Sequence, residues 1–160
     1  MKNNNTFLKA TLLAATLLGG TITPTLANDV DDTIKLRKVV MASMRLAGLS
    51  VMGADIPDNK RAEQNFVGQA KQFAASAEMI PFVLKTKALG KDSSVKSHVM
   101  ESEDIWENWD DFTAMSGQML ADARAVEKLA SAGDYAGAKA AAGKAFKANC
   151  KSCHDKYQDN

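Results

Sequence analysis

The chain has 160 residues, of which 20 are Lys or Arg and 19 are Asp or Glu, giving a formal net charge of +1. This length is enough for one domain with one hydrophobic core. The nearly balanced charge excludes the basic excess that nucleic-acid-binding proteins present on one face, so no nucleic acid partner is expected.

Residues 1–27 are expected to be a secretory signal peptide. Two lysines begin an apolar run that ends near Ile22, and Thr25-Leu26-Ala27 then offers a cleavage site. A retained membrane anchor is the alternative, although this run is short for a spanning helix, and no later segment is apolar for long enough to cross a membrane. We therefore predict that residues 28–160 form one exported domain, located in the periplasm and not attached to the membrane.

Apolar residues recur at helical spacing in four parts of the mature chain, and no part shows the sustained alternation of a strand. Turn and capping residues separate these parts, namely Gly53 to Pro57, a polar connection at about 85–101, and Gly133 with Asp134. Pro81 is expected to disturb or end the second helix. The expected helices cover approximately residues 31–52, 58–80, 102–131 and 135–157.

These segments predict an all-α fold, an antiparallel four-helix bundle, because amphipathic helices joined by mostly short connections pack in this way. The connection at about 85–101 is longer than a usual bundle loop, so we expect it to hold a short turn or to wrap a neighbour. Apolar steps of four and three predict helices packed almost parallel. Expected core positions are Phe66, Ala70, Phe73, Ala77 and Ile80 in the second helix, Ile105, Trp109, Phe112, Met119, Ala123 and Val126 in the third, and Tyr135, Ala138, Ala142, Ala145 and Phe146 in the fourth.

The end of the fourth expected helix carries the sequence Cys150-Lys151-Ser152-Cys153-His154, which contains both cysteines of the chain. Two cysteines separated by two residues and followed directly by histidine are the attachment signature of c-type haem. Each thiol adds across one haem vinyl group, and the imidazole reaches the iron as an axial ligand. The motif therefore predicts one covalent haem c near the C-terminus, held by Cys150, Cys153 and His154.

Three other uses of these cysteines fit the sequence less well. A disulfide is the ordinary expectation for two cysteines in an exported chain, but it does not account for the adjacent His154. A thioredoxin-like pair opens a helix that follows a strand, whereas this pair lies near the end of a helix. Zinc requires four ligands, and the chain has only one other histidine, His98, in an expected loop.

The motif does not specify the second axial position of the iron. Methionine or a second histidine usually occupies that position in six-coordinate c-type haem. His98 is expected to be solvated in its polar loop, which leaves methionines, and each of these also serves as a core residue. The methionines considered are Met41, Met44, Met52, Met79, Met100, Met115 and Met119.

Four helices with a C-terminal Cys-x-x-Cys-His resemble the class II c-type cytochromes, and the cytochrome c′ family in particular, over essentially the whole mature chain. The position four residues after the haem histidine is usually basic in that family and is Gln158 here, which is a departure. Further similar features are Ile34-Lys35-Leu36-Arg37 followed by Met41 and Met44, the pair Ile105-Trp106, and Gly133-Asp134 before an alanine-rich last helix.

The resemblance implies places for two residues of the first helix. Arg37 would lie near the haem propionates or the haem edge, with a solvated or ion-paired arginine as the alternative. Met41 would occupy the distal pocket over the iron. In cytochromes c′ an apolar residue there leaves the iron five-coordinate and high-spin, whereas in the low-spin branch of the family a methionine there ligates the iron. Met41 fits both branches, and Arg37 favours the five-coordinate form.

The resemblance thus implies a periplasmic monohaem cytochrome with five-coordinate iron that binds the diatomic gases NO and CO, transfers single electrons, or does both. The alternative is a six-coordinate His/Met cytochrome that is purely an electron carrier, and a haem-free structural bundle is a third hypothesis. No paired acids, nucleophile or general base indicate an enzyme. Redox proteins are the expected partners, and the family implies a homodimer through the first two helices.

Overall fold

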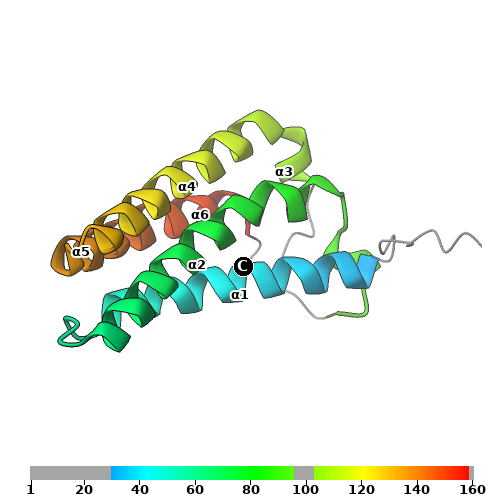
Figure 1. Cartoon of the computed structure of the whole chain (residues 1–160). Coiled ribbons are helices and arrows are strands. Elements are labelled where there is room, and N and C mark those ends of the chain that lie inside the picture. The colour runs from blue at the N-terminus through cyan, green and yellow to red at the C-terminus, as the bar shows by residue number, and fades with distance from the viewer. Residues whose placement is uncertain (1–29, 96–102, 159–160) are drawn as a thin grey trace, which may run out of the picture.

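The fold is an antiparallel four-helix bundle, as predicted, in a computed structural model that describes residues 30–95 and 103–158. Each long helix runs opposite to the one before it (Figure 1). The predicted signal peptide, His98, Met100 and the expected helix start at 102 lie outside the described residues. The bundle consists of α1 (Val30–Gly53), α2 (Lys60–Lys85), α4 (Trp109–Ser131) and α5 (Tyr135–Ala145), which α6 (Lys151–Tyr157) continues.

The core lies where the helical periodicity predicted it. Trp109, Tyr135 and Phe146 are half-buried against this core. The other predicted positions of the last three helices are buried, namely Phe66, Ala70, Phe73, Ala77, Ile80, Ile105, Phe112, Met119, Ala123, Val126, Ala138, Ala142 and Ala145. Since alanine is small and favours helix, the alanines of α5 let it approach its neighbours closely.

Helix α2 begins slightly later and ends later than its predicted span of 58–80. Asn59 is its N-cap, with a side-chain oxygen that accepts a hydrogen bond from the backbone N–H of Ala62 at 3.0 Å. Pro81 lies inside the helix, so the expectation that it disturbs or ends the helix was wrong about the end. Proline removes one backbone donor, but the turn after it buries Val83 and Leu84, and this burial favours continuing the helix.

Side chains from elsewhere in the bundle cap the C-terminal end of α2. The last carbonyls of any helix lack partners within the helix. Nε of Arg37 in α1 donates to the Val83 carbonyl oxygen at 3.0 Å, and the indole Nε1 of Trp106 donates to the Leu84 carbonyl oxygen at 2.9 Å. These two caps stabilise the final turn of α2, beyond Pro81.

The connection that follows α2 is attached to the start of α1. It holds the 3₁₀ turn η1 (Gly90–Asp92), which confirms the expected short turn. The Asp31 carboxylate accepts hydrogen bonds from Ser93 Oγ at 2.5 Å and from the backbone N–H of Ser94 at 2.8 Å. Hydrogen bonds from these two serines lower the pKa of Asp31 to about 2.

The third predicted helix is two helices, α3 (Asp104–Glu107) and α4, separated at Asn108. The side-chain Nδ2 and the backbone N–H of Asn108 both donate to the Asp104 carbonyl oxygen, at 2.9 and 3.0 Å. Asparagine competes with regular helical hydrogen bonds in this way, so the chain bends here before α4 begins.

The turn between α4 and α5 follows the prediction. Gly133 has a φ of +81°, a conformation that glycine adopts without strain. The Asp134 N–H donates to the Leu129 carbonyl oxygen at 3.0 Å, which completes a Schellman motif. The Asp134 side chain then caps α5 by accepting a hydrogen bond from the Gly137 N–H at 2.9 Å.

The fourth predicted helix is not one regular α-helix. Helix α5 ends at Ala145, a five-residue π-helical turn η2 (Phe146–Cys150) follows, and α6 completes the chain to Tyr157. A π turn accommodates one additional residue in an otherwise α-helical run, and such turns are frequent at functional sites. The cysteine motif begins at the last residue of this turn.

Candidate haem site

A cavity of about 570 Å³ lies inside the bundle between α1, the C-terminal end of α2, α3, the N-terminal half of α4, and residues of the segment 146–158. This volume is in the range of about 300–1,000 Å³ that is typical of ligand and cofactor sites. Most of the cavity surface is apolar. Its apolar walls include Met44, Ile80, Leu84, Ile105, Phe112 and Met119.

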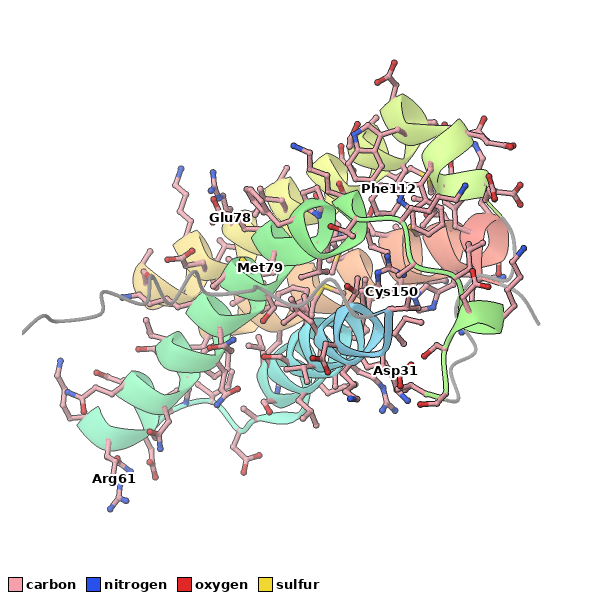
Figure 2. All side chains as sticks on the ribbon, turned by 90° about the vertical axis from the view of Figure 1, so that its right-hand side faces the viewer. Asp31, Arg61, Glu78, Met79, Phe112 and Cys150 are labelled. Carbon is pink, nitrogen blue, oxygen red and sulfur yellow. The ribbon has the colours of Figure 1, made fainter. Side chains whose placement is uncertain are left out.

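Cys150, Cys153 and His154 all border this cavity. Both cysteines are half-buried free thiols, and His154 is exposed at the cavity edge. In Figure 2, which looks along α1, Cys150 lies between α1 and the ribbon of the last helix. The structure therefore brings the three residues of the motif to one side of one cavity, although they come from a π turn and a separate short helix.

The π turn η2 sets which side chains of the last helix face the interior. One interior row runs from Ala138 to Tyr157 in five steps of three or four residues, which is 19 residues in five turns or about 3.8 per turn instead of 3.6. Its members are Ala138, Ala142, Phe146, Cys150, Cys153 and Tyr157. An unbroken α-helix would reach its fifth turn one residue earlier, at Lys156, which is exposed here. The π turn thus rotates the motif so that the two cysteines face the cavity.

Burial raises the pKa of both thiols. Loss of solvent is what raises the pKa of Cys150. Loss of solvent is also the largest cause for Cys153, and the nearby Cys150 and Asp111 raise its pKa further. A raised pKa keeps each thiol protonated near neutral pH and lowers its reactivity toward oxidants.

Segment 149–157, here called the attachment segment, is tied to α4 at both ends. At its start, Asn149 Nδ2 donates to Asp122 Oδ2 at 2.7 Å. At its end, Tyr157 OH donates to Asp111 Oδ2 at 2.5 Å, and Lys156 Nζ contacts the same oxygen at 2.8 Å. These donors lower the pKa of Asp111, with Lys156 the larger cause and Tyr157 the second.

These two α4 carboxylates were not among the site residues predicted from the sequence. Asp111 and Asp122 lie on the polar face of an amphipathic helix, where an acidic residue usually contacts only solvent. The one available signal was their spacing of 11 residues, which is close to three helical turns and puts both on one face. Nothing in the sequence shows that this face meets the last helix.

Arg37 is a buried wall of the cavity and supports the chain after α2. In addition to its bond to Val83, it donates from Nη1 to the Ala88 carbonyl oxygen at 2.6 Å and from Nη2 to that of Thr86. Its guanidinium also lies over the Trp106 ring, 5.3 Å from the ring centre. Burial lowers the pKa of Arg37 to about 10, so the side chain remains charged at neutral pH.

These hydrogen bonds give Arg37 a role in capping α2 that was not predicted from the sequence. A buried cation needs hydrogen-bond partners, and here the partners are backbone carbonyls at the negative end of the α2 helix dipole. Because Arg37 also borders the cavity, its charge acts on whatever the cavity holds. Its expected position near the haem edge remains a prediction.

The structure narrows the choice among the methionines. Met41 is half-buried, borders the cavity, and lies one helical turn after Arg37 on α1. Met79 is exposed and Met52 does not border the cavity, so neither is placed to reach a group bound there. The methionines of the described residues that border the cavity are Met41, Met44, Met115 and Met119.

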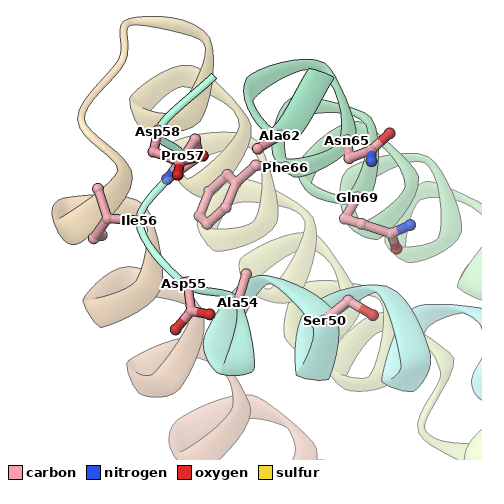
Figure 3. A pocket seen from close by; sticks show the side chains of 10 residues that line it. All are labelled: Ser50, Ala54, Asp55, Ile56, Pro57, Asp58, Ala62, Asn65, Phe66 and Gln69. Atoms are coloured by element: carbon pink, nitrogen blue, oxygen red, sulfur yellow. The ribbon is translucent and has the colours of Figure 1, made fainter. Parts of the chain in front are cut away.

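A second cavity, of about 450 Å³, lies at the turn between α1 and α2 (Figure 3). Its lining includes Asp55, Asp58, Asn65 and Gln69 around the ring of Phe66. It contains neither cysteine nor histidine, and a larger share of its surface is polar than in the first cavity. The first cavity is therefore the candidate cofactor site.

The residues around the first cavity fit a covalently bound haem. Two thiols in Cys-x-x-Cys spacing and a following imidazole stand on one side, and apolar side chains from α1, α2, α3 and α4 form most of the remaining walls. A planar apolar macrocycle requires such walls, while its iron requires a nitrogen donor such as His154. The donor set and the apolar lining thus agree with the group that the motif predicts.

Comparison with known proteins agrees with this site. The sequence profile of the family described as cytochrome C′ matches residues 32–158. Two solved structures of cytochrome c prime from Alcaligenes xylosoxidans are similar, both nitric oxide complexes of variants in which one leucine is replaced, by alanine in one and by isoleucine in the other. No curated protein sequence gives a significant match.

Both solved structures have a TM-score of 0.65 and a sequence identity of 17% with this chain. The alanine variant covers 84% of this chain and the isoleucine variant 83%, and each alignment covers 98% of the solved chain. At this identity the likeness establishes the shared fold.

Proposed function

This chain belongs to the cytochrome c′ family, and from that premise we propose that it is an exported monohaem cytochrome with one open iron site. The family carries one covalent haem c, and the chain is accordingly a haem c protein. We assign the attachment to Cys150 and Cys153 and the axial ligand to His154, because these three side chains border one side of the cavity. Haem supplies an iron that changes oxidation state and binds small ligands.

The apolar distal wall is the observation that carries the proposal of an open site. Away from the attachment segment, the cavity is bordered by side chains such as Met41 and Leu84, which neither stabilise a bound anion nor order water. Arg37 lies on the same wall, but its donors are already bonded to backbone carbonyl oxygens. Such a wall admits small uncharged molecules in preference to ions. Nitric oxide is bound in both similar solved structures, so NO and CO are the proposed ligands.

Single-electron transfer is the second activity that we propose for this site. Electron transfer through haem needs no nucleophile, general acid or general base from the protein. We propose that the protein is not an enzyme. Lys38 and Arg45 are exposed cations at the cavity edge, where an acidic surface of a redox protein would approach.

A purely electron-carrying, six-coordinate form is the second candidate, and one observation favours it. Met41 borders the cavity on the wall that faces the attachment segment, and a thioether is a common sixth ligand of c-type haem. A methionine ligand would raise the reduction potential and close the gas site. The same side chain, unligated, would instead act as an apolar cover over the iron.

The optical spectrum of the purified holoprotein tests both candidates. We expect a broad high-spin ferrous spectrum that sharpens when NO or CO is added. A sharp reduced α band together with a methionine–iron charge-transfer band would reject the open site and support the six-coordinate form.

Substitution of Met41 separates the two candidates further. In Met41→Ala the resting spectrum should stay the same, and CO should bind faster because an apolar cover has been removed. Met44→Ala is the matched control, since Met44 borders the same cavity but is almost fully buried in the core. A resting spectrum that changes from low-spin to high-spin in Met41→Ala alone would show that Met41 ligates the iron.

Export to the periplasm and homodimerisation complete the proposal. No helix within residues 30–95 and 103–158 is long and apolar enough to cross a membrane. Helices α1 and α2 carry exposed apolar side chains that a partner subunit would cover. These side chains are Leu36, Val39, Leu46, Leu49 and Ile56 from α1 and the turn after it, with Met79 and Phe82 from α2. Sedimentation of the mature protein would test for the dimer.

A further inference from the structure

The attachment segment has little backbone packing of its own. Helix α6 is only seven residues long. The close backbone contacts of the bundle are concentrated between α1 and α2, between α2 and α4, and between α4 and α5, while α6 contacts mainly the π turn before it. Because short helices are marginal without tertiary support, the position of α6 depends on side-chain contacts.

Two carboxylates of α4 provide these contacts. Asp122 accepts the hydrogen bond of Asn149 just before the first cysteine, and Asp111 accepts those of Tyr157 and Lys156 just after the histidine. Hydrogen bonds to an ionised carboxylate are short and about twice as strong as neutral ones. The Tyr157 ring also packs edge-on against Phe112 of α4, with 5.8 Å between ring centres.

The haem motif therefore lies between two anchored ends. Asp111 and Asp122 are three turns apart on one face of α4. The two residues that bond to them, Tyr157 and Asn149, are eight residues apart and lie at the two ends of the attachment segment. Neither carboxylate borders the cavity. Any effect of these two carboxylates on the cavity consequently acts through the attachment segment to which they are bonded.

We propose that Asp111 and Asp122 are positioning residues that fix the rotation of the attachment segment against α4, so that His154 meets the iron in a single orientation. The inference rests on the proposed attachment of haem through Cys150, Cys153 and His154. It goes beyond that attachment, because the motif alone supplies bonds to the haem and leaves the orientation of the imidazole unspecified. The α4 carboxylates supply the missing constraint.

The test compares the holoprotein with the double variant Asp111→Ala/Asp122→Ala and with Tyr157→Phe. Covalent haem should still attach in both, since the motif is intact. The backbone amides of residues 150–157 should exchange hydrogen about tenfold faster relative to those of α2, because an anchoring hydrogen bond has been lost. The EPR signal of the ferric iron, which depends on imidazole orientation in either coordination state, should broaden or split.

Two matched variants serve as controls. Glu78→Ala removes the ion pair between Glu78 of α2 and Arg124 of α4, 3.2 Å apart, which lies away from the attachment segment. Tyr135→Phe removes the hydroxyl of a tyrosine whose ring packs against Phe66. Both controls should leave the EPR signal and the exchange of residues 150–157 unchanged.

Each outcome decides the proposal. Unchanged exchange and an unchanged EPR signal in folded Asp111→Ala/Asp122→Ala would overturn it, as would equal effects of Tyr157→Phe and Tyr135→Phe. If the double variant does not fold, Tyr157→Phe alone decides, because it keeps the ring and its packing. If the unmodified protein carries no covalent haem, the proposed function fails separately, and the exchange comparison still tests the anchoring.

Discussion

The two walls of the haem cavity are held in place by different means. The wall formed by α1 belongs to a regular helix of 24 residues, which packs along α2 and buries a continuous stripe of side chains. The opposite wall is a π turn and a seven-residue helix, tied to α4 by hydrogen bonds at its two ends. The first wall is stabilised by packing and the second by a few polar contacts, so we expect them to respond differently to substitution.

The largest effect should come from removing the thiols of the attachment wall. In Cys150→Ser/Cys153→Ser no covalent haem should remain, because serine does not form the thioether bonds. Haem staining after denaturing electrophoresis measures this loss. Ser152→Ala, at an exposed position between the cysteines, is the control and should keep full staining. Retention of covalent haem in the double variant would refute the attachment.

A large loss of stability should follow from substitution of Arg37 on the α1 wall. Arg37→Leu leaves the carbonyls of Val83, Thr86 and Ala88 without their donors, and we expect the free energy of unfolding to fall by about 3 kcal/mol. Arg45→Leu, at an exposed position on the same helix, should change it by less than about 0.5 kcal/mol. Urea unfolding of both variants measures the difference, and equal effects would contradict the capping role.

A smaller effect is expected where the two walls meet. Gly48 of α1 faces Phe146 of the π turn, and a Cβ built at Gly48 would lie 2.1 Å from Phe146 Cε2 and 3.1 Å from Phe73 Cε2. Gly48→Ala should therefore lower the free energy of unfolding by about 1–3 kcal/mol through overpacking.

The control for this overpacking is a glycine with open space around it. A Cβ at Gly68 in α2 meets nothing within 4 Å, so Gly68→Ala should raise the free energy of unfolding by about 0.5–1 kcal/mol through helix propensity. In thermal melts, the melting temperature should fall in Gly48→Ala and rise in Gly68→Ala if the contact at Gly48 is as close as described. A stabilising Gly48→Ala would show that Phe146 moves aside freely.

The smallest effect concerns the start of the α1 wall and depends on pH. Serine hydrogen bonds lower the pKa of Asp31 to about 2, below the value of about 3.9 for an unfolded chain. The ionised form therefore stabilises the fold above pH 4, and this contribution is lost as the pH falls from about 4 to about 2. Asp31→Asn should be slightly less stable than the unmodified protein at pH 7, and the difference should shrink toward pH 2. If the difference in the free energy of unfolding between the two proteins stayed constant from pH 7 to pH 2, the lowered pKa of Asp31 would be contradicted.

The contrast between the walls also explains what the sequence could and could not predict. Positions such as Phe73 and Ala123 were predicted as core because helical periodicity is a property of each segment alone. Cys150, Cys153 and His154 were identifiable because their chemistry is written in five consecutive residues. Both kinds of information are local.

The features that were missed require knowledge of which helices meet. The extension of α2 past Pro81 depends on caps donated by Arg37 and Trp106, which are distant in the sequence. The anchoring of the attachment segment depends on Asp111 and Asp122 facing it from α4. Periodicity gives the face of a helix but not its neighbour, so these contacts became visible only in the assembled bundle.

The π turn η2 has a consequence for how this chain can diverge. Deleting one residue between 146 and 150 would leave 18 residues for the same five turns, which is the α-helical number, so a regular helix would form and the residues after it would keep their direction. If the π turn became α-helical at constant length, in contrast, every residue after it would rotate by about 100° around the helix axis. Two descendants of one gene that differed by one codon here would therefore both present the two cysteines to the cavity, one from a π turn and the other from a regular helix.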